Sequence, residues 1–172
     1  MVGQKIEDAI EELLTGDSKK NAMDFVAYMS ANDMQLEWYE GIWFCNSSVV
    51  LINGAAQCPG PWTIFHSGYG HEYPPDEIPA GKDDDKIGLS DLTVDEHLKE
   101  VAWAHVKSCF NFTSNEKECG CGRQPGRHTT VFGKEFDNVC TATLAFCNPD
   151  AETLVYIKKL VELMKLGRLK TM

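Results

Sequence analysis

The chain has 172 residues, of which 43% are hydrophobic and 24% charged, a balance that fits one globular domain with its own core. Its net charge of −10 disfavours nucleic acid and anionic membrane surfaces as partners, because both are negatively charged. No apolar run approaches the roughly 20 residues that a membrane span requires, and residues 1–14 mix acidic with apolar positions, unlike a signal peptide. We therefore expect a cytoplasmic protein whose thiols stay reduced.

Two short helices are predicted within residues 1–33. Apolar residues from Ile6 to Leu14 recur at the i, i+3, i+4, i+7 spacing of one helix face. The Gly16-Asp17-Ser18 sequence ends this helix, and Ser18 is expected to cap a second helix with Phe25 and Met29 on its apolar face.

Residues 34–66 predict an antiparallel β-meander. Short apolar and aromatic runs at 36–39, 42–45, 49–52 and 62–65 are separated by turn residues such as Glu40-Gly41 and Asn53-Gly54. The third run is almost continuously apolar, which indicates a central strand covered on both faces.

Segment 67–92 is rich in Gly, Pro and acidic residues and is predicted to be a long surface loop. Within 93–172, the Thr93-Val94-Asp95-Glu96 sequence is a capping box for a helix running to about Cys109. A Cys-rich loop, a strand over 139–146 and a last helix beginning near Asn148 and ending at Gly167 should follow. The order of elements predicts a single α+β domain over 1–172, with an antiparallel sheet of four to five strands and helices on one face.

A zinc site is predicted around the Cys-rich loop. Cys119 and Cys121 present two thiolates with glycines beside them, and Cys109 and Cys140 are the nearest cysteines on either side. Four such thiolates would complete a tetrahedral structural site and clip the loop onto the sheet.

The ligand set of this site is left open. His128 is a competing fourth ligand, and His105 lies four residues before Cys109 on the predicted helix. Unligated thiols are the simpler alternative, because cysteine is often buried without a ligand, and the remaining cysteines, 45, 58 and 147, are expected to be of that kind. Seven cysteines is an odd number, which argues against a closed disulfide framework.

The tryptophans suggest a second kind of site. Four indoles are many for a domain of this size, and most are expected in the core. Trp43 and Trp62, lining a pocket near Glu135, would suit a flat or cationic small molecule, since binding pockets combine apolar walls with a few polar groups.

Residues His128 to Cys140 (HTTVFGKEFDNVC), which follow the Cys-rich loop, resemble the C-terminal part of small uncharacterised proteins from anaerobic Firmicutes. The resemblance extends through Pro61 to Ile64 and the Asp95 to Trp103 helix, so it covers most of the chain, and it implies no established activity. The order of elements is also similar to YjbR-like and GyrI-like α+β domains, which sequester ligands or partners; that likeness is one of fold.

These observations favour a module that binds a small molecule or a partner and is stiffened by zinc, because the chain carries no local catalytic signature. Two alternatives remain open: a small enzyme that uses a cysteine or Glu135, and a domain that meets a basic protein through its acidic loop.

Overall fold

The computed structural model describes residues 5–39, 42–45, 48–52, 60–66, 94–109 and 126–169. The predicted acidic loop 67–92, together with Cys119 and Cys121, lies outside these ranges. The helices are α1 (Ile6–Leu13), α2 (Gly16–Ala31), α3 (Glu96–Ala104) and α4 (Ala151–Leu169). The strands are β1 (Glu37–Tyr39), β2 (Ile42–Cys45), β3 (Ser48–Ile52), β4 (Trp62–His66), β5 (Val106–Ser108), β6 (Arg127–Val131) and β7 (Lys134–Cys147).

The described strands form one antiparallel sheet in the order β1-β2-β3-β4-β7-β5, and β6 pairs with β7 beyond this path. Seven strands exceed the predicted four to five. The two unpredicted strands, β5 and β6, are short and pair only with the long β7. The hydrogen bonds of β5 are non-local, whereas β6 forms a hairpin with β7. Neither short strand has an alternating pattern that would have predicted it.

One row of side chains shows how the sheet builds the core. Trp43, Val50, Ile64 and Phe146 lie opposite one another on β2, β3, β4 and β7, and all four are buried. Because side chains alternate between the faces of a strand, this register places one whole set of apolar residues toward the helices.

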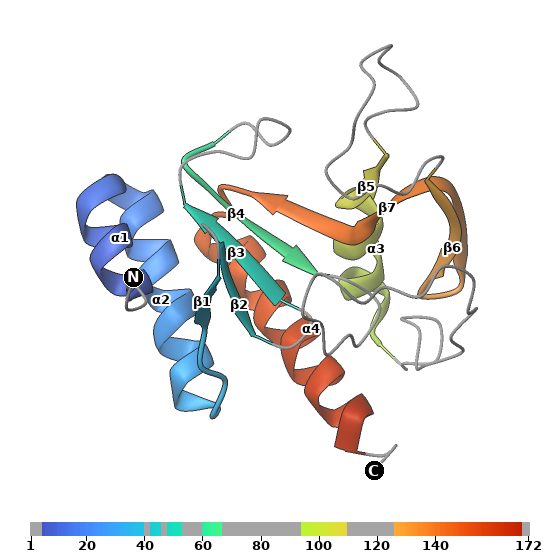
Figure 1. Cartoon of the computed structure of the whole chain (residues 1–172). Helices are drawn as coiled ribbons and strands as arrows, with labels where there is room; N and C mark the ends of the chain where they lie inside the picture. The colour runs from blue at the N-terminus through green and yellow to red at the C-terminus, as the bar shows by residue number, and fades with distance from the viewer. Residues whose placement is uncertain are drawn as a thin grey trace.

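All four helices pack on this face of the sheet. In Figure 1, α4 runs behind the sheet, α1 and α2 lie at its β1–β3 end, and α3 lies beside β5. Each helix contributes a stripe to the same core, with members that include Ile10, Phe25, Leu98, Ile157 and Leu160. The prediction of an α+β fold with helices on one face and two N-terminal helices is confirmed.

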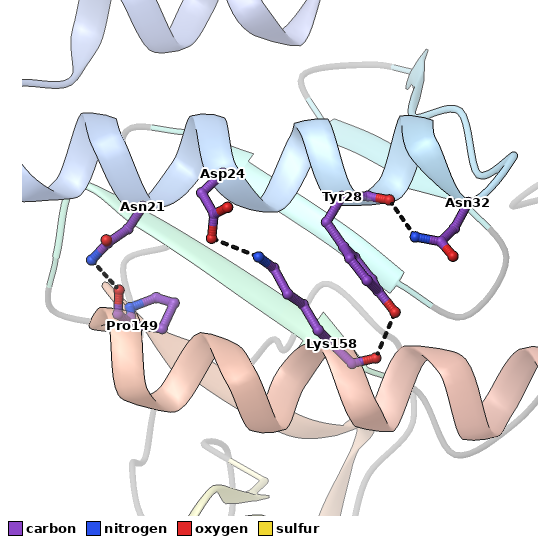
Figure 2. A network of polar contacts seen from close by, with 6 residues as sticks. All are labelled: Asn21, Asp24, Tyr28, Asn32, Pro149 and Lys158. Carbon is purple, nitrogen blue, oxygen red and sulfur yellow. Dashed lines mark hydrogen bonds and ion pairs between the residues drawn. The ribbon is translucent and has the colours of Figure 1, made fainter.

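Polar contacts hold α2 and α4 side by side in a parallel arrangement (Figure 2). Near the start of both helices, Asn21 donates a hydrogen bond to the carbonyl of Pro149 at 3.1 Å. One to two turns further along α2, Lys158 pairs with Asp24 at 2.6 Å, and the Tyr28 hydroxyl donates to the carbonyl of Lys158 at 3.1 Å. These contacts fix the axial register of the two helices, while the apolar stripes supply the buried surface.

The ends of the helices differ from the predicted ones. Ser18 does not cap α2, which begins after Thr15; its hydroxyl instead donates to the side chain of Asn148 at 2.7 Å. The caps of α3 and α4 are Asp95 and Asp150, each of which accepts a backbone N–H three residues later. A carboxylate at this place stabilises unpaired N–H groups, and accordingly the pKa of both aspartates is lowered, mainly by these hydrogen bonds.

The helix predicted to reach Cys109 ends at Ala104, and the last helix continues past Gly167 to Leu169. After Ala104, the His105 carbonyl accepts a hydrogen bond from the Ala145 N–H at 2.9 Å, and Val106 lies opposite Leu144. The helix therefore ends at Ala104 because the following residues pair with the edge of β7. This tertiary contact overrides the local helical preference.

A tight hairpin joins β6 to β7, although the sequence predicted a strand only from residue 139 onward. Phe132 and Gly133 form its two-residue turn and both have positive φ, 47° and 80°, as type I′ turns require. Phe132 is nonetheless buried, and the Trp103 indole N–H donates to the carbonyl of Val131 at 2.7 Å. Burial in the core, together with the hydrogen bond to the preceding residue, thus holds Phe132 in its left-handed conformation.

Candidate functional site

Two of the four predicted zinc ligands lie near each other, where β5 and β6 meet β7. Cys109 is buried directly after β5, and Cys140 is half-buried on β7. Both carry reduced thiols. Because Ser108 lies opposite Val139, the two cysteines occupy the same part of the strand pair. The other two predicted ligands, Cys119 and Cys121, fall in the segment 110–125 outside the described residues.

Asn138 forms hydrogen bonds with both residues that flank segment 110–125. Its carbonyl accepts from the Cys109 N–H at 2.6 Å, and its side-chain amide donates to the Cys109 carbonyl at 3.4 Å. The Gly126 N–H donates to the Asn138 side-chain oxygen at 3.2 Å. We call Cys109, Gly126 and Asn138 the loop junction. It brings Cys109 and Gly126, the two residues that flank the segment, to one place, two residues before Cys140.

Asn138 and Gly126 suit this place for physical reasons. Asn138 has a φ of 57°, a conformation that asparagine tolerates better than most residues. It sits where the register of β6 and β7 shifts by one residue, as in a β-bulge. At Gly126, a Cβ atom would lie 2.6 Å from the Cβ of Cys109 and from the Asn138 backbone, so no larger residue fits without movement.

The loop junction does not amount to a metal site by itself. Among the described residues, no three His, Cys, Asp or Glu side chains lie close enough together to hold a metal ion. Zinc ligation that includes Cys119 and Cys121 stays a prediction. Of the alternative ligands, His105 stacks on Phe146 and contacts the Val101 carbonyl through Nδ1 at 2.7 Å, whereas His128 lies on β6 two residues after the junction.

His128 forms an exposed pair with Asp137 across the bulge. The distance from Nδ1 to the Asp137 carboxylate is 2.7 Å, although the two side chains are 59% and 90% exposed. The hydrogen bond and the charge of Asp137, with a contribution from Glu135, raise the pKa of His128 above its usual value. The pair ties β6 to β7 beside the loop junction.

We expect this pair to make stability depend on pH. Since the folded-state pKa of His128 is raised, its contribution is fully present below the unfolded pKa of about 6.5 and is lost as the pH rises through the folded pKa. The melting temperature of Asp137→Asn should therefore fall below that of the wild type at about pH 5.5 and approach it at about pH 9. Thermal melts of both proteins across this range measure the difference, and a gap that widened toward alkaline pH would contradict the assignment.

The predicted tryptophan pocket does not form around Glu135. Trp43 and Trp62 are only 3% and 0% exposed and belong to the core, and Trp43 packs against Trp38 with ring centroids 4.5 Å apart. Glu135 is exposed on the β6–β7 hairpin, opposite Thr130. Trp62 lies at the other end of β7, where its carbonyl accepts from the Asn148 N–H. Asn148 is 13 residues after Glu135. Because extended residues advance about 3.3 Å each, Glu135 and Trp62 are too far apart to line one pocket.

A groove that the sequence did not indicate lies between the start of α1, the second half of α2 and the chain before β1. Its volume is about 500 Å³. Ile6, Val26 and Leu36 supply its apolar wall. Polar side chains complete the lining: Lys5, Glu7, Asp8, Ser30 and Gln35. No local motif marks these residues, because the groove exists only once α1 is packed across α2.

Cys147 departs from the expectation of an unligated thiol. It is disulfide-bonded at the end of β7, opposite Thr63, and its partner lies outside the described residues. Since Cys45, Cys109 and Cys140 carry thiols, the partner is one of the three remaining cysteines, at positions 58, 119 and 121. The odd number of cysteines therefore does not exclude a single disulfide.

Comparisons with family models, with curated proteins and with solved structures found no match to the chain. Within the described ranges, none of the helices combines the length and apolar character needed to cross a membrane.

Proposed function

We propose that the protein is a small-molecule-binding α+β module that a structural zinc ion stiffens. The observation that carries the binding role is the groove between α1 and α2. Its volume of about 500 Å³ falls within the range of about 300–1,000 Å³ typical of ligand pockets.

The lining of the groove indicates the chemistry of its ligand. Ile6 and Val26 are buried helix residues that already belong to the core. Around them, Ser30 and Gln35 offer neutral hydrogen-bonding groups, and two carboxylates outnumber the single ammonium of Lys5. An amphipathic molecule that is uncharged or cationic fits this combination best, since an anion would face a net negative rim.

Titration with Nile red, an uncharged amphipathic dye, tests the groove. Dye fluorescence should saturate with the wild type, and Ser30→Trp should bind at least about tenfold more weakly, because the indole fills the site at little cost to the core. Ala27→Trp is the matched control, since Ala27 is also exposed on α2 but outside the lining. Equal binding by all three proteins would refute the groove as the ligand site.

The zinc ion is the second part of the proposal, with Cys109, Cys119, Cys121 and Cys140 as ligands. The loop junction supports it, because Cys109 and Gly126, which flank the segment with the Cys-x-Cys pair, both bond Asn138, two residues before Cys140. This ligand set requires that Cys147 pair with Cys58. Cys58 precedes Gly60 by two residues, and a Cβ on Gly60 would lie 2.8 Å from the Cβ of Asn148, the neighbour of Cys147.

A further inference from the structure

Three reactive or polar side chains form one row across the core face of the sheet. The register places Cys45 of β2 opposite Ser48 of β3, and Ser48 opposite His66 of β4. The next row on the same face, two residues further along each strand, is wholly apolar and consists of Trp43, Val50 and Ile64. The polar row is therefore an exception within an otherwise apolar surface.

The inner two members of the row are hydrogen-bonded and cut off from solvent. Ser48 Oγ lies 3.1 Å from His66 Nδ1, and the two residues are 2% and 0% exposed. Burying a hydroxyl and an imidazole costs free energy that one hydrogen bond only partly offsets. An apolar pair at these positions would serve packing better, so packing does not explain why they are polar.

Cys45 forms the outer end of the row. It is half-buried, carries a reduced thiol and packs against the edge of the core. Residues directly opposite in an antiparallel pair have Cβ atoms about 5 Å apart. Cys45 and Ser48 are therefore cross-strand neighbours on one face of the sheet, and the row passes from a partly exposed thiol through a hydroxyl to a buried imidazole.

We propose that Cys45 is a nucleophilic thiol that Ser48 and His66 activate, and that its substrates are small molecules with an electrophilic carbon. With the neutral His66 ring protonated on Nε2, Nδ1 accepts the Ser48 hydroxyl proton while Ser48 Oγ accepts the thiol proton of Cys45. The resulting thiolate attacks the carbon: a carbon–sulfur bond forms, the bond to the leaving group breaks, and the leaving group departs with that electron pair. The proton stays on His66.

A second histidine nearby provides a matched control. His66 and His105 both contact Phe146, with ring centroids 6.2 Å and 4.5 Å away. Only His66 belongs to the polar row, because His105 lies between α3 and β5, where its Nδ1 atom contacts the carbonyl of Val101. Replacing His105 therefore perturbs the same aromatic neighbour without removing the proton acceptor of the row.

Alkylation by iodoacetamide, in which iodide is the leaving group, tests the proposal. Peptide mass spectrometry should show Cys45 of the wild type reacting at pH 7 at least about tenfold faster than glutathione, with His66→Asn and Ser48→Ala each removing that advantage. His105→Asn should leave the rate within about twofold, and lowering the pH should slow the wild type less than Ser48→Ala.

Two results would overturn the activated thiol. One is a Cys45 that reacts no faster than glutathione in the folded wild type. The other is an unchanged rate in Ser48→Ala. This variant creates only a small cavity, so it should stay folded even if His66→Asn unfolds. Circular dichroism and thermal melts establish which variants are folded. The row lies on the sheet, apart from the groove lined by α1 and α2, so Nile red binding and thiol reactivity can fail independently.

Discussion

Gly126→Ala is expected to destabilise the protein by about 3 kcal/mol, the upper part of the range for overpacking. The new methyl group would lie 2.6 Å from the carbonyl carbon of Asn138 and from the Cβ of Cys109. Neither atom is the end of a flexible side chain, so the backbone at the loop junction has to move. Two hydrogen bonds would weaken with it: the one that the Gly126 N–H donates to the Asn138 side-chain oxygen, and the one that the Asn138 amide donates to the Cys109 carbonyl.

Gly133→Ala is the matched control for this prediction. Gly133 has a φ of 80° and nothing within 4 Å of an added Cβ, so alanine there incurs the conformational penalty alone, about 1 kcal/mol. Urea denaturation of the two variants and the wild type measures the difference in the free energy of unfolding. If Gly126→Ala were no less stable than Gly133→Ala, the tight contact at the loop junction would not exist in solution.

Removing zinc is expected to have the other large effect. If one ion binds at 1,000 times its dissociation constant, the folded state gains about 4 kcal/mol, and a chelator should abolish that gain. Native mass spectrometry of the untagged chain should show one zinc per molecule. Cys109→Ser and Cys140→Ser should lose it and melt at lower temperature, because each removes a thiolate ligand.

Cys45→Ser controls for the loss of a thiol elsewhere, since Cys45 lies on β2 away from the loop junction, and it should keep the metal. His128→Gln should also keep the zinc ion if the four cysteines are the ligands, and it should lose the ion if His128 is a ligand. A wild-type mass equal to the bare polypeptide would refute the zinc proposal. Peptide mapping without reductant provides an independent check, because a disulfide from Cys147 to Cys119 or Cys121 would leave too few thiolates.

Patterns within short stretches predicted much of the fold. The apolar spacing of residues 6–14 and the run of Phe25 and Met29 located α1 and α2, and the alternating runs in residues 34–66 located β1 to β4. Predictions from such patterns succeed because each helix or strand buries one face, and the spacing of its own apolar residues reveals that face. The same logic predicted helices on one side of an antiparallel sheet.

Predictions failed where the partner, rather than the segment, decides the structure. Residues 105–108 continue a helical pattern by composition, yet Val106 pairs with Leu144 as a strand. β6 pairs with β7 as a hairpin, and the Trp103 indole bonds the last residue of β6. Strands as short as β5 and β6, which their partner strand holds in place, leave little trace in their own sequence.

The candidate sites divide in the same way. The sequence by itself determined the α+β class, the N-terminal helices, the meander and the positions of Cys109 and Cys140 along the chain on either side of a Cys-rich segment, because these depend on local periodicity and spacing. Only the tertiary structure decided that Trp43 and Trp62 fill the core, that α1 and α2 enclose a groove, and that Cys45, Ser48 and His66 share a row. Those features depend on strand register and helix packing, which bring together residues that are distant along the chain.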